Sequence, residues 1–152
     1  MFSLFKKKKE FFSKEENDKI VAAIRHAEEC TSGEVRIYVE SKCKFIDPLD
    51  RAVEIFTELK MHNTQDHNAV LLYVALKDRQ LAVYADSGIH QKVGTLFWEE
   101  AVNKILLHFD KKNYANGIVH CMAEIGDALK ENFPYNKDTD KNELPDEIIF
   151  GR

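Results

Sequence analysis

Four polar residues at the ends of expected strands are the best candidates for chemistry. Glu34 opens an alternating apolar segment, Asp66 and Asn68 precede a continuous apolar run, and Asp86 follows a third apolar segment. Ligand sites in open α/β sheets lie beyond the carboxyl ends of strands, where loops and helix N-termini converge, and Asp86 follows such an end. Hard cations prefer carboxylate and carbonyl oxygens, and Gly88 would allow close backbone approach. We therefore expect a divalent-cation site formed by Glu34, Asp66, Asn68 and Asp86.

Two alternatives remain open for the same residues. The segment from Asp86 to Gly88 is also an ordinary turn, in which aspartate accepts a hydrogen bond from its own backbone. Histidines at positions 62, 67 and 90 would favour a transition metal if their loops converged. Because nothing in the sequence fixes that geometry, we expect these histidines to be solvated loop residues.

Catalytic signatures are absent from the sequence, which contains no P-loop, GxSxG, HExxH, GxGxxG or CxxC motif. We therefore expect no enzymatic activity. The alternative is a metal-dependent phosphatase, in which the cation would polarise a phosphoryl group and Asp86 would act as nucleophile or move a proton. That alternative lacks an arginine close to Asp86, since Arg79 lies at the other end of the same strand.

Capping residues mark where the first two helices begin. Ser13 and Glu16 have capping-box spacing, and Gly33 could end that helix with positive φ. Asp47 before Pro48 predicts a second helix, because the first helical residue needs no backbone donor. We expect its inner face to contain Ala52, Val53, Phe56 and Leu59.

Three apolar segments predict strands. Residues 34–40 alternate and predict a half-exposed strand, whereas 69–76 are continuously apolar and predict a central strand buried on both faces. Residues 81–85 follow a short connection and predict an antiparallel hairpin. The helix between the first two strands allows them to be parallel. With helical stripes over 98–109 and 118–129, the order predicts an α/β fold, an α/β/α sandwich with a small mixed sheet.

Composition describes one domain of 152 residues with a net charge of -4, long enough to bury a core without crosslinks. Its 44% hydrophobic content excludes a disordered chain. Three cysteines without a CxxC pair favour a reducing compartment, and neither a signal peptide nor an apolar run of about 20 residues is present. We expect a cytoplasmic monomer with a protein partner and no nucleic-acid partner.

Unusual composition is confined to the two ends, which flank a domain at 13–134. In residues 1–12, Lys6 to Lys9 lie between phenylalanines, which suggests a membrane-surface adaptor through residues 2–12. The alternative is that these phenylalanines pack on the domain. Residues 135–152 form an acidic tail whose apolar end, 148–150, can dock on the domain. Its Asp138, Asp140 and Asn142 match only the start of a calcium loop.

Several separated motifs resemble the TPM domain family. They are Gly33-Glu34, the stretch from Thr64 to Ile89 with its Asp78-Arg79 turn, Phe97-Trp98, Tyr114 with Gly117, and Phe133-Pro134; the tail is similar to that of bacterial members. The resemblance implies an α/β/α sandwich. For function it implies an acid phosphatase in some members, calcium binding in others, and accessory roles at membrane complexes in others.

By position, the family's acidic pocket would map to Glu34 and Asp86, with Asn68 nearby. The chain departs from the family pattern at His67 and Ser87, where basic residues are common, and at Ala69, where glycine is common. Losing two cations there disfavours phosphate and leaves divalent-cation binding intact. We therefore favour a TPM-like accessory module that binds Ca²⁺ rather than Mg²⁺.

Overall fold

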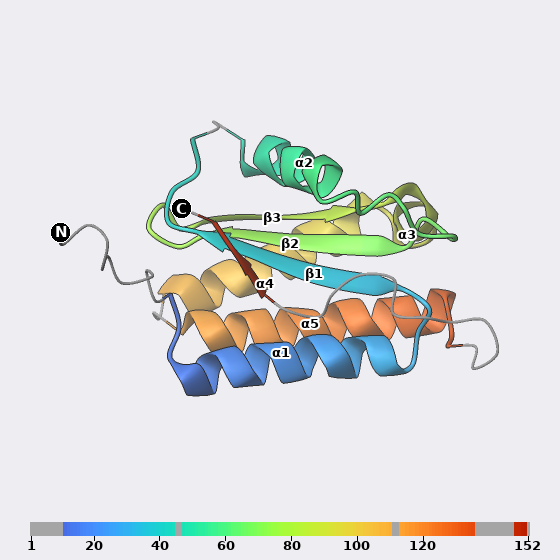
Figure 1. Cartoon of the computed structure of the whole chain (residues 1–152), viewed down its shortest axis with the longest axis horizontal. Helices are drawn as coiled ribbons and strands as arrows, with labels where there is room; N and C mark the ends of the chain where they lie inside the picture. The colour runs from blue at the N-terminus through green and yellow to red at the C-terminus, as the bar shows by residue number, and fades with distance from the viewer. Residues whose placement is uncertain (1–10, 45–46, 111–112, 136–147, 152) are drawn as a thin grey trace, which may run out of the picture.

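The computed structural model describes residues 11–44, 47–110, 113–135 and 148–151 (Figure 1). Its elements, in chain order, are α1 (Lys14–Glu29), β1 (Glu34–Glu40), α2 (Pro48–Glu58), β2 (Ala69–Ala75), β3 (Gln80–Ala85), α3 (Ser87–Val93), α4 (Thr95–Asp110), α5 (Tyr114–Asn132) and β4 (Ile148–Phe150). The predicted helices and strands are all present, and α3 and β4 are additional elements.

The four strands form one mixed sheet in the order β3-β2-β1-β4. β1 is parallel to β2, and β2 and β3 form the expected antiparallel hairpin. At the other edge, β4 runs parallel to β1, with Ile148 opposite Ile37. The apolar end of the tail therefore docks on the domain as a strand.

Helices cover both faces of the sheet (Figure 1). One face, with the side chains of Val35, Ile37 and Val39, packs in a core with residues of α1, α4 and α5. The other face, with Leu71 and Tyr73, packs against α2. This arrangement confirms the α/β/α sandwich.

β1 is more buried than expected. Six of its seven residues are buried, including Arg36 and Glu40, which the alternating pattern had placed in solvent. The prediction of a half-exposed strand was wrong because helices cover both faces of the sheet, and on the second face Glu40 contacts Arg51 of α2. On α2, Ile55 is buried whereas Val53 is exposed, so the predicted inner face was wrong at Val53.

Helix caps confirm the predicted starts of α1 and α2. Glu16 donates its backbone N–H to Ser13 Oγ at 3.1 Å, and Ser13 donates to the Glu16 carboxylate at 2.9 Å. Asp47 caps α2 by accepting from the Leu49 N–H at 2.9 Å. Gly33 does not have the predicted positive φ. It is instead a site of close packing, because a Cβ there would lie 2.6 Å from Leu129 Cδ2.

Phe11 and Phe12 pack on the domain at the β4 edge. Their ring centroids lie 5.7 and 6.4 Å from that of Phe150, and Phe12 is buried. Residues 1–10, which include the lysine cluster, lie outside the described residues. Within the described ranges, no helix combines the length and hydropathy required to cross a membrane.

None of the three cysteines forms a disulfide, and they differ in burial. Cys121 is buried in the core, as expected, and burial, with a smaller contribution from the charge of Glu124, raises its thiol pKa to about 12. Because the thiolate is the reactive species, we expect iodoacetamide at mildly alkaline pH to modify exposed Cys30 first, Cys43 more slowly and native Cys121 last. Mass spectrometry of timed samples would measure this order. All three should react in guanidinium chloride, whereas equal native rates for Cys121 and Cys30 would contradict the prediction.

Candidate functional site

The candidate site lies at the edge of the sheet where β1 and β2 begin and β3 ends. Glu34 is opposite Ala69 in the parallel register, and its N–H donates to the Asn68 carbonyl at 3.4 Å. Asp86 continues the antiparallel pairing by donating its N–H to the Ala69 carbonyl at 2.9 Å. The chain therefore brings Glu34, Asn68 and Asp86 to one edge, as expected from their positions at strand ends.

Asp86 is held in place by α3 and by the loop before β2. Its Oδ1 accepts from the Ser87 N–H at 2.7 Å, and its Oδ2 lies 3.3 Å from His67 Nδ1. The His67 carbonyl accepts from the Gly88 N–H at 2.8 Å. These contacts require glycine at 88, because a Cβ there would lie 2.1 Å from the Asp66 carbonyl oxygen. The expected turn at Asp86 is thus the N-cap of the short helix α3.

Asn68 is only 1% exposed, although it is a polar residue. Its backbone N–H donates to Thr64 Oγ1 and its side-chain amide donates to Ser32 Oγ, both at 3.3 Å. Its Oδ1 atom is buried and has no hydrogen-bond partner in the described part of the chain. Buried amide oxygens are nearly always satisfied, so this oxygen can accept a further ligand.

The other two predicted ligands, Glu34 and Asp66, differ in burial. Glu34 is buried, whereas Asp66 is exposed on the loop and only its main-chain carbonyl is placed against Gly88. Among described residues, no group of three or more His, Cys, Asp or Glu side chains could hold a metal ion. A cation at this edge would therefore depend on amide and main-chain oxygens and on water as well as on carboxylates.

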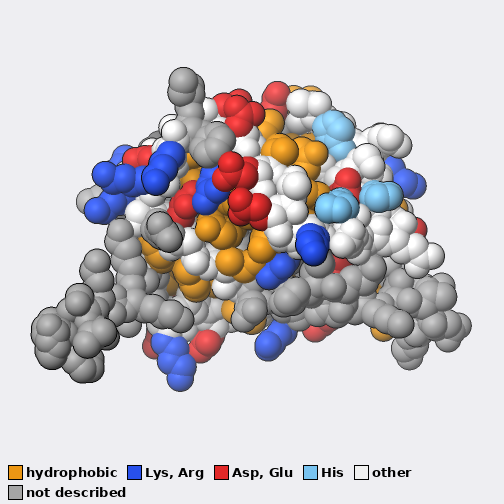
Figure 2. Space-filling view, turned by 45° about the horizontal axis from the view of Figure 1, so that its top comes forward, with side chains coloured by type: hydrophobic (Ala, Val, Ile, Leu, Met, Phe, Trp, Pro, Cys, Tyr) orange, Lys and Arg blue, Asp and Glu red, His pale blue; other side chains and the backbone are white. Residues whose placement is uncertain are grey.

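Histidine side chains gather at the end of the molecule where α3 and the loop before β2 lie, as Figure 2 shows. His62, His67 and His90 are all exposed, as expected. His67 has a positive φ of 49°, an uncommon conformation for a residue with a Cβ. His90 lies on α3 rather than in a loop.

A groove of about 760 Å³ runs from the candidate site along β3. Asp86, Ser87 and His90 line one end, and residues of β3, α2 and α4 line the rest. Three carboxylate residues, Asp47, Asp86 and Glu99, are among its lining residues, which include no lysine or arginine. Nothing in the sequence patterns indicated this groove, because its walls come from three separate elements.

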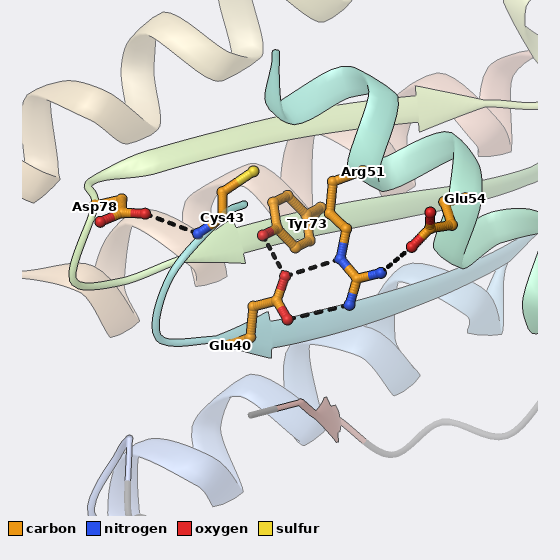
Figure 3. Close-up of polar contacts among 6 residues, drawn as sticks. All are labelled: Glu40, Cys43, Arg51, Glu54, Tyr73 and Asp78. Carbon is orange, nitrogen blue, oxygen red and sulfur yellow. Dashed lines mark hydrogen bonds and ion pairs between the residues drawn. The ribbon is translucent and has the colours of Figure 1, made fainter. Parts of the chain in front are cut away.

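A second polar cluster, which sequence reasoning missed, lies at the opposite end of β1 (Figure 3). Arg51 binds the buried Glu40 carboxylate with two nitrogens, Nε to Oε2 at 3.0 Å and Nη2 to Oε1 at 3.1 Å. Tyr73 donates its hydroxyl to Glu40, and Arg51 also contacts Glu54. The only sign of this cluster in the sequence was that Arg36 and Glu40 alternate with apolar residues in β1, and that pattern had indicated solvent exposure.

This cluster stabilises the fold rather than offering a reactive group. Burial, followed by the hydrogen bond with Glu40, raises the Tyr73 pKa, and the hydrogen bond to Glu40 raises the Arg51 pKa. Tyr73 therefore stays neutral and Arg51 stays charged. Because the Glu40 carboxylate already accepts three hydrogen bonds, its role is to join α2 to β1 and β2.

The mixed sheet between helical layers, with polar residues where β1 and β2 begin, defines a small α/β/α domain. The TPM domain model matches residues 6–128, and the chain belongs to the TPM domain family. Among solved structures, the chain is similar to the BA42 protein of the psychrophilic bacterium Bizionia argentinensis. The two are 43% identical with a TM-score of 0.86, over 95% of this chain and 99% of that chain.

Two more distant structures share the fold alone. The N-terminal domain of a Corynebacterium glutamicum protein is 13% identical with a TM-score of 0.62, over 78% of this chain and 74% of that chain. The N-terminal domain of a P. gingivalis protein is 16% identical with a TM-score of 0.64, over 80% of this chain and 78% of that chain. No curated protein matches the chain.

Proposed function

We propose that this TPM domain is a non-enzymatic accessory module that binds a divalent cation where β1 and β2 begin. The observation that carries the proposal is the buried Asn68 Oδ1, which lacks a partner among described residues at the same edge as Asp86. Glu34, Asn68 and Asp86, with main-chain oxygens of the Asp66–His67 loop, would hold the ion. The ion would supply positive charge at an edge rich in oxygen atoms.

The chemistry of these oxygens favours Ca²⁺ over Mg²⁺. Ca²⁺ accepts six to eight oxygen ligands in flexible geometry, including carbonyl groups and water, whereas Mg²⁺ demands near-octahedral geometry. A site with few carboxylates on a loop is better matched by Ca²⁺. Its low carboxylate count also predicts weak binding, roughly in the 10⁻⁴–10⁻³ M range of the weaker calcium modules.

Titration of Ca²⁺ and Mg²⁺ into the ¹⁵N-labelled full chain tests the proposal. We expect amide shifts at residues 34, 66–68 and 86–89, larger with Ca²⁺, and their loss in Asp86→Asn. Asparagine also caps helices, so this variant should keep α3 while losing the charge. Asp127→Asn, an exposed change on α5, is the matched control and should bind normally. Unmoved resonances at millimolar metal, or equal shifts in Asp86→Asn, would refute the site.

The same samples can test for catalysis with p-nitrophenyl phosphate and either metal. We expect no hydrolysis, because the carboxylates lining the groove repel a phosphate ester and its lining includes no lysine or arginine. Metal-dependent turnover that disappears in Asp86→Asn would instead establish a hydrolase.

We also propose a cytoplasmic location, which the absence of disulfides among the three cysteines supports. Disulfides are rare in reducing compartments, and unpaired thiols are typical there. Fractionation of the native host's cells would test the location.

A further inference from the structure

Within the described ranges, the outer side of β3 is an unpaired sheet edge six residues long. Asp86 donates its N–H to the Ala69 carbonyl, and hydrogen-bonded pairs alternate along an antiparallel ladder. The backbone groups of Leu81, Val83 and Ala85 therefore point away from β2. Among described residues, none of them makes a backbone hydrogen bond outside the sheet. Such an edge is a template for a further strand.

The groove along β3 gives this edge the shape of a binding site. α2 and α4 lie on opposite faces of the sheet, so their side chains flank the edge of β3 on both sides (Figure 1). Leu49 of α2, which is 41% exposed, and Val102 of α4 provide apolar walls. An added strand would occupy the sheet layer between these two walls.

Charge indicates what kind of strand fits. Asp47, Asp86 and Glu99 line the groove, and no lysine or arginine does. A second copy of this chain would bring the same carboxylates into the same groove, which like-charge repulsion disfavours. A cationic segment is attracted instead. Because alternate side chains of an added strand face opposite sides, such a segment can place cations toward carboxylates and apolar groups toward the walls.

Trp98 supplies a second polar feature of the groove. Trp98 is among the lining residues of the groove, and its buried Nε1 has no hydrogen-bond partner in the part of the chain that the structure describes. A buried donor without an acceptor is unfavourable. A main-chain carbonyl brought in by an added strand would give this donor an acceptor after a small movement of the ring.

We propose that the open edge of β3 binds an extended segment of a partner protein in which lysine or arginine alternates with apolar residues. The segment adds a fifth strand beside Leu81, Val83 and Ala85. The main-chain bonds provide affinity, and the carboxylates and apolar walls provide specificity. This inference rests on the accessory role proposed above and names the chemistry of its partner, but it does not depend on the cation.

The test is titration of an acetylated, amidated Val-Lys-Val-Lys-Val-Lys peptide into the ¹⁵N-labelled full chain with EDTA. We expect shifts and slower hydrogen exchange at the amides of residues 81, 83 and 85. The indole N–H of Trp98, the only tryptophan, should shift as well. Because the cation titration is read at residues 34, 66–68 and 86–89, failure of one proposal is distinguishable from failure of the other.

Two matched controls separate strand addition from general attraction. Glu99→Lys should weaken binding about tenfold, whereas Glu100→Lys, an exposed neighbour outside the groove lining, should change it less than twofold. A peptide N-methylated at alternate residues keeps the charge but loses the main-chain donors, and it should not protect the β3 amides. Equal binding of that peptide, equal effects of the two substitutions, or protection of β3 by self-association would overturn the proposal.

Discussion

Replacing Arg51 with methionine is expected to lower the free energy of unfolding by about 3 kcal/mol. Arg51 neutralises Glu40 through two hydrogen bonds, at 3.0 and 3.1 Å, and only 19% of the Arg51 side chain and 7% of the Glu40 side chain are exposed. Without the guanidinium, the carboxylate remains buried with a hydroxyl donor from Tyr73. Urea unfolding at neutral pH measures the loss.

A surface ion pair provides the matched control for this prediction. Lys104 and Glu124 are 2.8 Å apart, but their side chains are 63% and 37% exposed. Lys104→Met should therefore cost much less than Arg51→Met. In the Arg51→Met background, Glu40→Gln should restore part of the stability, because it removes the uncompensated charge. Equal losses for Arg51→Met and Lys104→Met would show that the Glu40 cluster does not stabilise the fold.

Substituting alanine for Gly88 is expected to cost about 3 kcal/mol, the upper part of the usual range for overpacking. The added Cβ would lie 2.1 Å from the Asp66 carbonyl oxygen and 2.6 Å from that of His67. Both atoms belong to the main chain, so no side-chain rotation can relieve the clash. The penalty is a steric clash without backbone strain, because Gly88 does not have a positive φ; among described glycines only Gly94 does. Thermal and urea unfolding would measure it.

This substitution should also disturb the candidate site. Moving α3 away from the loop breaks the bond from the Gly88 N–H to the His67 carbonyl and separates Asp86 from His67. Ser87→Ala, an exposed change on the same helix, is the control and should cost less than about 0.5 kcal/mol. If Gly88→Ala were as stable as Ser87→Ala, the close approach of α3 to the loop would be wrong.

Local signals were sufficient for most helices and strands. Ser13 with Glu16 and Asp47 with Pro48 predicted helix starts correctly, because a cap acts on backbone donors within one turn of itself. The apolar run of β2 predicted a strand buried on both faces, and every residue of β2 is buried. The helix α3 was missed because its seven residues include only two apolar residues that pack on the core, Ile89 and Val93, which is too short a pattern to indicate a helix.

The convergence of Glu34, Asn68 and Asp86 was predictable in outline. All three stand next to strand ends, and a parallel pair followed by a hairpin brings those ends to one edge. The sequence could not show which side chains are buried there. Asn68 is enclosed and Asp66 is exposed, although they are two residues apart, because the loop reverses direction at His67, whose φ is 49°.

Pairing between distant segments accounts for what local patterns could not reveal. β4 comes from the far end of the chain and pairs with β1, and α2 covers the second face of the sheet, so an alternation typical of half exposure belongs to a buried strand. Glu40 of that strand meets Arg51 of α2 and Tyr73 of β2. The groove along β3 likewise has walls from α2 and α4. Residue types and caps act over a few positions, whereas burial and site geometry arise only when remote elements pack together.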